Sequence, residues 1–317
     1  MYRVGVDLGG TNIVSAVLND ETYTLSGKSS RKTNLPRSAE EILDDIAVTI
    51  KEAIEKSGLK PSDIVSIGIG TPGSVNKSEG VIDFSNNLGF KNVPAIEILR
   101  RKTGFTSIYL DNDANCAALG EAVAGAGKGV KDFVAITLGT GVGSGIVING
   151  KLVTGANYAG GEIGHTVIVF NGEQCNCGRK GCWERYASAT ALIAQTKGAM
   201  LSHPYSKMWE LCENNINKVS GRTAFEAMRL GDNVAKNVVE TYMAYLACGI
   251  SNIINIFQPD ILCVGGGIGN EKENLLGPVR KIVESQRYSI YSEKQTILCS
   301  AVLGNDAGII GAALLDD

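Results

Sequence analysis

The chain has 317 residues, enough for two domains, and its 44% hydrophobic and 20% charged content is ordinary for a globular protein. Its formal net charge is −3 and its pI is about 5.6, which exclude the basic footprint of a nucleic-acid-binding protein. The N-terminus lacks the apolar run of a signal peptide, and no later segment is apolar for long enough to span a bilayer. We therefore expect a cytoplasmic protein with no nucleic-acid or membrane partner.

Two glycine-rich segments predict matching β-hairpins. Residues 4–19 and 134–149 each have the pattern of a strand, a glycine turn and a second strand. At a fixed offset they share Val4/Val134, Leu8/Leu138, Gly9/Gly139, Val17/Val147 and Asn19/Asn149. Unrelated glycine-rich hairpins also resemble one another, so these identities alone do not establish a duplication.

The segments that follow each hairpin support the duplication. After the first hairpin the periodicity predicts a helix over 39–56, a strand over 64–70, and then a helix over 95–102, a strand over 107–111 and a helix over 114–124. After the second it predicts helices near 189–198 and 224–230, a long helix over about 234–257, a strand over 261–264, a helix, a strand near 297 and a last helix from about 306. A repeated α/β unit predicts two similar lobes with a cleft between them.

The glycine turns and one aspartate predict phosphate and magnesium binding. Glycine turns can direct backbone N–H groups at phosphate oxygens without lysine or arginine. Asp7, at the end of the first strand, would hold Mg²⁺ through water. Two other nucleotide motifs fail: residues 27–29 lack the upstream glycine of a Walker A loop, and no helix follows the G-x-G-x-x-G match at 68–73.

Three cysteines and one of the only two histidines predict a tetrahedral zinc site. The four ligands would be His165, Cys175, Cys177 and Cys182. Glu162 and Glu184 flank this cluster, which leaves open either a zinc-stapled loop with two solvated acids or a functional site. A disulfide is the weaker interpretation, because a Cys-x-Cys pair closes a strained ring. The other five cysteines are expected to be free thiols, and His203 is expected in a surface loop.

Together these motifs resemble sugar kinases of the ROK (repressor, ORF, kinase) family, and the resemblance covers essentially the whole chain. The matching segments are Asp7–Thr11, Leu110–Asn115, Leu138–Gly145, Gly161–His165, Cys175–Glu184 and Gly265–Gly267. The resemblance implies the actin-like, ribonuclease-H-like ATPase fold, an α/β architecture with two lobes around a cleft. We expect a small lobe of residues 1–112 plus about 301–317, and a large lobe of 113–300 that carries the zinc loop.

The resemblance also implies roles for individual residues. Asp113 would be the general base, although its position before a helix also suits a simple N-cap, which the sequence alone favours. Sugar hydroxyls would bind Asn112, Asp113, Glu162, His165 and Glu184. Nucleotide phosphates, magnesium and adenosine would be held by Asp7, Gly9, Gly10, Thr11, Asn12, Thr140, Gly141, Gly266 and Gly267. Zinc, one ion per chain, would organise the sugar pocket through His165.

The implied function is an ATP-Mg²⁺-dependent kinase that phosphorylates glucose at its 6-hydroxyl, in a homodimer. N-acetylmannosamine kinase and fructokinase are alternatives, because room near the sugar 2-position, which we assign to the Thr71–Ser74 turn, decides between them. Residues 83–94 resemble the loop that glucokinases place before their second helix. A non-catalytic sugar sensor or repressor is the alternative from another class; the first strand begins at Tyr2, which leaves no room for a helix-turn-helix domain ahead of it.

Overall fold

The computed structural model describes residues 1–316, which divide into two compact units. Unit 1 comprises 1–135, 145–161 and 301–316, and unit 2 comprises Ile136–Ser144 and Glu162–Ser300. The lobe boundary at residue 112 that we expect from the sequence is a different division and stays a prediction. Within residues 1–316, no helix is both long and apolar enough to cross a membrane.

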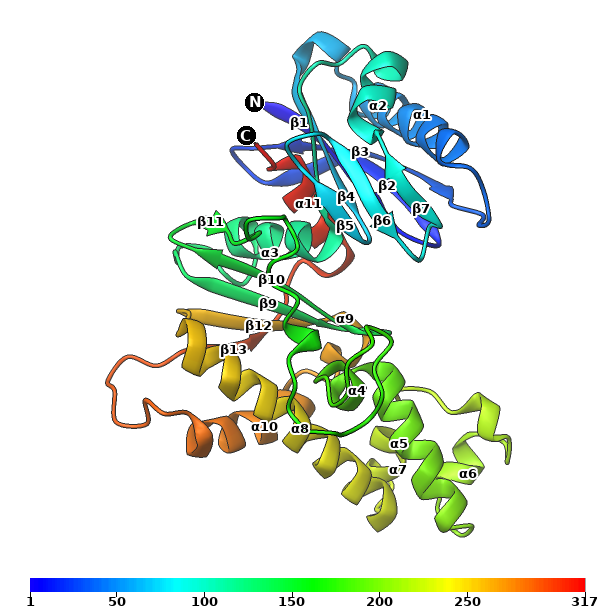
Figure 1. Cartoon of the computed structure of the whole chain (residues 1–317), viewed down its shortest axis with the longest axis vertical. Helices are drawn as coiled ribbons and strands as arrows, with labels where there is room; N and C mark the ends of the chain where they lie inside the picture. Colours follow the sequence, from blue (N-terminus) through cyan, green and yellow to red (C-terminus); the bar gives the residue numbers. More distant parts are fainter. Residues whose placement is uncertain (317) are drawn as a thin grey trace. The chain divides into compact units, whose positions relative to one another are not determined.

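The sheet of unit 1 is built around the first hairpin (Figure 1). Its strand order is β3 (Thr24–Lys32), β2 (Asn12–Asn19), β1 (Tyr2–Leu8), β4 (Ile64–Thr71) and β8 (Ile108–Asn112). Strands β1 and β2 pair antiparallel, whereas β4 pairs parallel with both β1 and β8. The hairpin-first order and the parallel strands confirm the topology expected from the sequence.

Helices cover both faces of this sheet. Helix α1 (Ala39–Ser57) begins at a capping box between Ser38 and Glu41, and its buried isoleucines enter the same core as Val4 and Val6. Helix α2 (Ala95–Thr103) contributes to this core as well. On the other face lies α11 (Ala307–Ala313), whose backbone approaches so closely that a Cβ on Gly5 would stand 1.9 Å from Ile309 O.

The second sheet repeats the order of the first. Its strands are β11 (Lys151–Leu152), β10 (Val142–Ile148), β9 (Phe133–Leu138), β12 (Ile261–Gly265) and β13 (Ile297–Ser300). The second hairpin, β9 and β10, occupies the positions that β1 and β2 occupy in the first sheet, and β12 and β13 run parallel like β4 and β8. This correspondence confirms the duplicated α/β unit.

Apart from β12, β13 and the adjoining parts of β9 and β10, the regular structure of unit 2 is helical. Its longer helices are α5 (Ala189–Ser202), α7 (Thr223–Arg229), α8 (Asn233–Phe257) and α10 (Glu273–Gln286), and its short ones are α4 (Glu184–Ala187), α6 (Met208–Leu211) and α9 (Gly266–Gly269). Buried Trp183 anchors the loop of Cys175, Cys177 and Cys182 to α8, since its ring fills the space beside Gly249 and its Nε1 donates to Tyr245 O at 2.9 Å. The expected helices and strands of both units are confirmed, with shifts of a few residues at their ends.

Two regions differ from what the sequence suggests. Strand β3 was not expected, because Leu25 is its only large apolar residue and the segment therefore shows no apolar alternation. Residues 83–94, expected as a loop, instead contain the end of β6 (Val81–Ser85) and all of β7 (Phe90–Val93), which form a small antiparallel sheet with β5 (Ser74–Asn76). These strands are too short to show a clear alternation, but Ile82, Phe90 and Val93 are buried in the core of unit 1.

Candidate active site

Unit 1 gathers the first group of predicted site residues at the ends of its parallel strands. Asp7 on β1 lies in register with Gly70 on β4, and Gly70 lies in register with Asp111 on β8. Gly70 has no side chain to separate its neighbours, and a Cβ there would meet Cys116 Sγ at 3.1 Å and the Cα atom of Asp113 at 3.6 Å. The sheet therefore brings Asp7, Asn112 and Asp113 to one edge.

Asn112, rather than Asp113, caps helix α3 (Asp113–Ala124). Its Oδ1 accepts from the backbone N–H groups of Ala114 at 2.8 Å and Asn115 at 3.3 Å, and its Nδ2 donates to Gly73 O at 3.0 Å. Asp113 is the first residue of the helix, and its Oδ1 accepts from Ala114 N at 2.9 Å. The N-cap role that the sequence suggested for Asp113 is therefore filled by its neighbour.

Burial perturbs both carboxylates of this edge. Desolvation raises the pKa of Asp113 above its usual value, against the opposing effect of the Ala114 N–H group. The pKa of Asp7 rises to about 6, mainly through desolvation and further through the negative charge of Asp113, while Lys28 opposes the rise. Two neighbouring carboxylates whose pKa values are both raised suit a site that accepts a proton or a cation.

A buried ion pair behind this edge was missed by the sequence analysis. Asp111 is 3% exposed, and its Oδ2 lies 2.6 Å from Lys77 Nζ. Its Oδ1 accepts from Asn112 N at 2.7 Å and from Asn115 Nδ2 at 2.9 Å, so Asp111 holds the strand end that leads into Asp113. The sequence does show a charged residue, Asp111, in an apolar strand, and a buried charge requires a partner. Nothing in the neighbouring sequence identifies that partner as Lys77.

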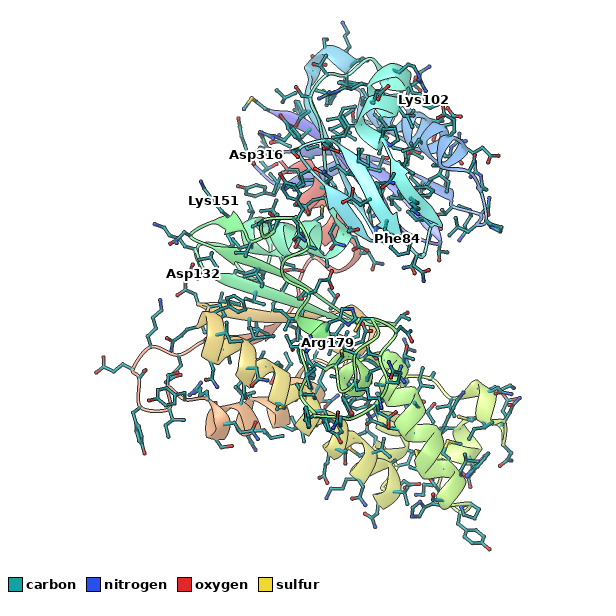
Figure 2. All side chains as sticks on the ribbon, in the orientation of Figure 1. Phe84, Lys102, Asp132, Lys151, Arg179 and Asp316 are labelled. Carbon is teal, nitrogen blue, oxygen red and sulfur yellow. The ribbon has the colours of Figure 1, made fainter. Side chains whose placement is uncertain are left out.

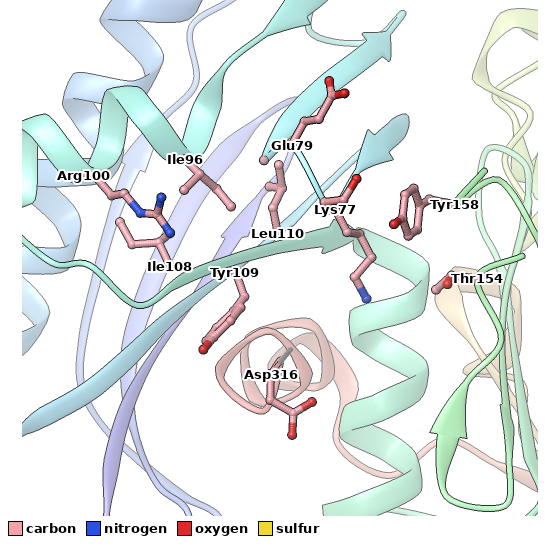
Figure 3. A pocket seen from close by; sticks show the side chains of 12 residues that line it. Lys77, Glu79, Ile96, Arg100, Ile108, Tyr109, Leu110, Thr154, Tyr158 and Asp316 are labelled. Atoms are coloured by element: carbon pink, nitrogen blue, oxygen red, sulfur yellow. The ribbon is translucent and has the colours of Figure 1, made fainter. Parts of the chain in front are cut away.

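Lys77 also lines a cavity of about 420 Å³ in unit 1 (Figure 3). Tyr109 and Tyr158 extend toward it from opposite sides, and Asp316 lies below them in that view. None of the predicted site residues lines this cavity, so it is separate from the edge that holds Asp7 and Asp113.

The first glycine turn is closed on itself and held by the neighbouring strand. Gly9 N donates to Asn12 O at 2.9 Å. Thr33, directly after β3, donates its Oγ1 to Gly9 O at 2.7 Å and its N–H to Thr11 O at 2.9 Å. Gly10 is exposed, and a Cβ on it would meet no protein atom within 4 Å, so a ligand has room to approach this turn.

The second glycine turn lies in unit 2 and closes in a similar way. Gly139 N donates to Gly141 O at 3.0 Å. A Cβ on Gly141 would stand 2.2 Å from Glu184 Oε2, so any larger residue here would have to displace that carboxylate. Gly266, whose φ is +82°, packs against Leu138 at the start of the turn, and a Cβ on it would lie 2.6 Å from Leu138 N.

Unit 2 also contains the cysteine and histidine cluster. Cys175 Sγ lies 3.6 Å from His165 Nδ1, and Cys177 Sγ lies 3.6 Å from Cys182 Sγ. All four ligand atoms lie within 4.8 Å of one another. Tetrahedral zinc with ordinary bond lengths separates two sulfurs by about 3.8 Å and a sulfur from a nitrogen by about 3.6 Å. The four residues therefore fit a Cys₃His zinc site, and none of the eight cysteines, which lie within the described residues, forms a disulfide.

The surroundings of these thiols shift their pKa values in opposite directions. Burial raises the pKa of the Cys182 thiol to about 12, whereas a backbone N–H group of Arg179 lowers that of exposed Cys177. Figure 2 marks Arg179 on this loop. Three clustered thiolates would repel one another, and a divalent cation offsets that repulsion when it displaces their protons.

The remaining predicted residues are divided between the two units. Unit 1 contains Asp7, Gly9, Gly10, Thr11, Asn12, Asn112 and Asp113. Unit 2 contains Thr140, Gly141, Glu162, His165, Glu184, Gly266, Gly267 and the three zinc-loop cysteines. Glu162 is exposed and directly precedes the short 3₁₀ turn that carries His165. His203, at the end of α5, is exposed as expected.

The duplicated sheets and paired glycine turns define an actin-like ATPase fold. The ROK family model matches residues 3–317, and the chain therefore belongs to the ROK family. It is 36% identical to a glucokinase of Thermotoga maritima over 98% of this chain and 95% of that one. A ROK family glucokinase from Streptomyces griseus, solved in complex with glucose and AMPPNP, matches with a TM-score of 0.81 and 32% identity over 99% of this chain and 98% of that one. A xylose repressor of Bacillus subtilis is 30% identical over 98% of this chain and 75% of its own length.

Proposed function

We propose that the protein is an ATP-dependent glucokinase that transfers the γ-phosphoryl group of ATP to the 6-hydroxyl of glucose. The observation that carries this proposal is the likeness, over almost the full length of both chains, to a ROK glucokinase that binds glucose and AMPPNP. The geometry of Asp113 supports it, because this carboxylate is free of the capping role and has a raised pKa. A general base works best when its pKa approaches the working pH.

In this mechanism Asp113 aligns the sugar hydroxyl and accepts its proton. The hydroxyl oxygen forms a bond to the γ-phosphorus while the bond from that phosphorus to the β,γ-bridging oxygen breaks, and ADP leaves. Backbone N–H groups of the two glycine turns stabilise the phosphate charges. Magnesium, when bound with ATP, neutralises part of that charge, and Asp7 would hold it through water.

The zinc site would organise the sugar-binding residues. His165 directs Nδ1 at the cysteines, which leaves Nε2 to donate to a sugar hydroxyl. Asn112, Glu162 and Glu184 would supply further donors and acceptors to the ring. Zinc bound to His165 and the cysteines would fix the orientation of the imidazole rather than act on the phosphate. We also propose a homodimer, on the family resemblance alone.

A panel of sugars tests the choice of substrate. We expect kcat/KM with ATP and Mg²⁺ to be highest for glucose, because a site that hydrogen-bonds each hydroxyl disfavours a sugar that leaves its polar groups unpaired. A value at least tenfold higher for N-acetylmannosamine or fructose would reassign the sugar and leave the kinase intact. Sugar binding without turnover of any hexose would contradict the kinase and support a sensor.

A further inference from the structure

The second glycine turn is held in place by the segment that follows the zinc loop. We call residues 184–190 the support segment and residues 139–142 the turn; both lie in unit 2. Three hydrogen bonds join them, and they are spread along the turn. The bonds are Val142 N to Glu184 Oε2 at 3.0 Å, Ala189 N to Gly139 O at 2.8 Å, and Thr190 Oγ1 to Thr140 O at 2.8 Å.

The carboxylate of Glu184 lies directly against Gly141 of the turn. A Cβ on Gly141 would stand 2.2 Å from Glu184 Oε2 and 3.1 Å from the carbon of the same carboxylate. A charged acceptor makes a stronger hydrogen bond to a backbone N–H group than a neutral one does. One carboxylate oxygen of Glu184 therefore fixes the end of the turn, where β10 begins.

The support segment is itself firmly anchored. Cys182, one of the expected zinc ligands, precedes Glu184 by two residues, and Trp183 between them is buried against α8. Tyr242 of α8 donates its hydroxyl to Ala187 O at 2.7 Å. Ser188 caps α5 by accepting from Ala191 N at 3.0 Å. Helix α8 therefore holds the support segment, Cys182 and Trp183 join that segment to the cysteine loop, and the support segment holds the turn.

We propose that the support segment positions the turn for nucleotide phosphate, and that zinc binding and nucleotide binding are coupled through it. Thr190 is a positioning residue in this scheme, since it contacts the turn and not the phosphate. The proposal rests on the proposed function in one respect, the assignment of the turn to phosphate. By linkage, whatever the zinc loop contributes to nucleotide affinity, nucleotide contributes equally to zinc affinity.

Substitutions at Thr190 test the positioning role. Thr190 is exposed, and Thr190→Val removes only the hydroxyl, so we expect the variant to fold and to bind AMPPNP about three- to tenfold more weakly, the effect of one lost hydrogen bond. Its KM for glucose should change less than twofold. Thr190→Ser, which keeps the hydroxyl, should restore the affinity. The matched control is Thr196→Val on the same helix, whose hydroxyl donates to Leu192 O and which should bind AMPPNP like the wild type.

Calorimetric titration with AMPPNP measures these affinities without turnover. An affinity of Thr190→Val within twofold of the wild type, or a loss that Thr190→Ser shares, would overturn the positioning role. Removing zinc from the wild type with a chelator should weaken AMPPNP binding at least threefold, and an unchanged affinity would overturn the coupling. Failure of the proposed function would give a different result. In that case the wild-type protein would bind AMPPNP but phosphorylate no hexose.

Discussion

The two glycine turns are equivalent in the duplicated fold but are supported in different ways. The first is held by Thr33, which directly follows β3, the strand beside the hairpin. In the second sheet the corresponding strand, β11, has only two residues and pairs with Val147 and Ile148, at the end of β10 away from the turn. The support segment after the cysteine loop supplies the contacts that Thr33 supplies in unit 1. The repeated hairpin thus keeps its backbone while its support changes.

The local sequence similarity therefore predicts that both hairpins form, but it does not predict which residues support each turn. The first turn depends on a strand of its own sheet, so its geometry forms together with unit 1. The second turn depends on a loop that we expect to be stabilised by a metal. The two turns should therefore respond differently to metal removal and to substitution, which the following predictions examine.

The largest effect is expected at Asp113, which belongs to the unit of the first turn. Asp113→Ala should lower kcat by about 10²–10⁴, because it removes the general base, while folding and glucose binding remain largely intact. Steady-state kinetics and calorimetric glucose titration measure the two quantities. Asn112 caps α3 in either case, so a loss of helix stability does not confuse the result. Retention of more than a tenth of the wild-type kcat would exclude the role of Asp113.

The next largest effect is expected when the zinc loop is broken. Cys177→Ser should release the one zinc ion per chain, lower the Tm, and weaken both glucose and nucleotide binding, because His165 and Glu184 depend on the same loop. Cys177 is exposed, so the substitution creates no cavity in the core. Cys248→Ser, outside the cluster, is the control. Elemental analysis that finds no zinc in wild-type protein purified without chelator would refute the site.

Asp7 should make stability depend on pH in unit 1. Its pKa is raised from 3.8 to about 6 on folding, so the folded chain binds this proton more tightly than the unfolded chain. The free energy of unfolding should therefore fall as the pH rises from about 4 to about 6, by at most about 3 kcal/mol. Asp7→Asn should remove this loss and be more stable than the wild type at pH 7.5 but not at pH 4. Urea unfolding without nucleotide or magnesium measures it, and an equal difference at both values would contradict the raised pKa.

The smallest effect compares the two supports directly. Thr33→Val removes the hydrogen bond to Gly9 O, and we expect it to weaken AMPPNP binding by about 1 kcal/mol, as for Thr190→Val. This loss should be the same in zinc-bound and zinc-free protein, because Thr33 lies in unit 1 and the expected zinc ligands lie in unit 2. Calorimetry in both states checks it. A zinc-dependent effect of Thr33→Val would show that the turns do not have separate supports.

The elements that could be predicted are those whose pattern lies in residues that are close together in the sequence. Helices α1 and α8 have apolar residues at helical spacing along their whole length, and both hairpins have glycine between alternating strands. Strands β5 to β7 have three to five residues, too few for a periodicity, so the small sheet was missed. The residue types of the zinc site and the motif around Asp113 were visible for the same local reason.

Contacts between distant segments could not be predicted. Nothing near Lys77 in the sequence indicates that it pairs with Asp111, and nothing near Thr140 indicates that Thr190 bonds to it. The sequence also assigned Asp113 an alternative role as the N-cap, because Asn112 and Asp113 are both good capping residues and only the backbone geometry decides between them. The two pairings depend on contacts between segments that are far apart in the sequence, and the choice of cap depends on backbone geometry.

Identification of the reaction products tests the central proposal most directly. Wild-type protein incubated with glucose, ATP and Mg²⁺ should form glucose 6-phosphate and ADP in equal amounts, which ³¹P nuclear magnetic resonance resolves in one sample. Asp113→Ala at the same concentration should form little of either. Release of inorganic phosphate without a sugar phosphate, or no consumption of ATP with any hexose, would contradict a glucokinase.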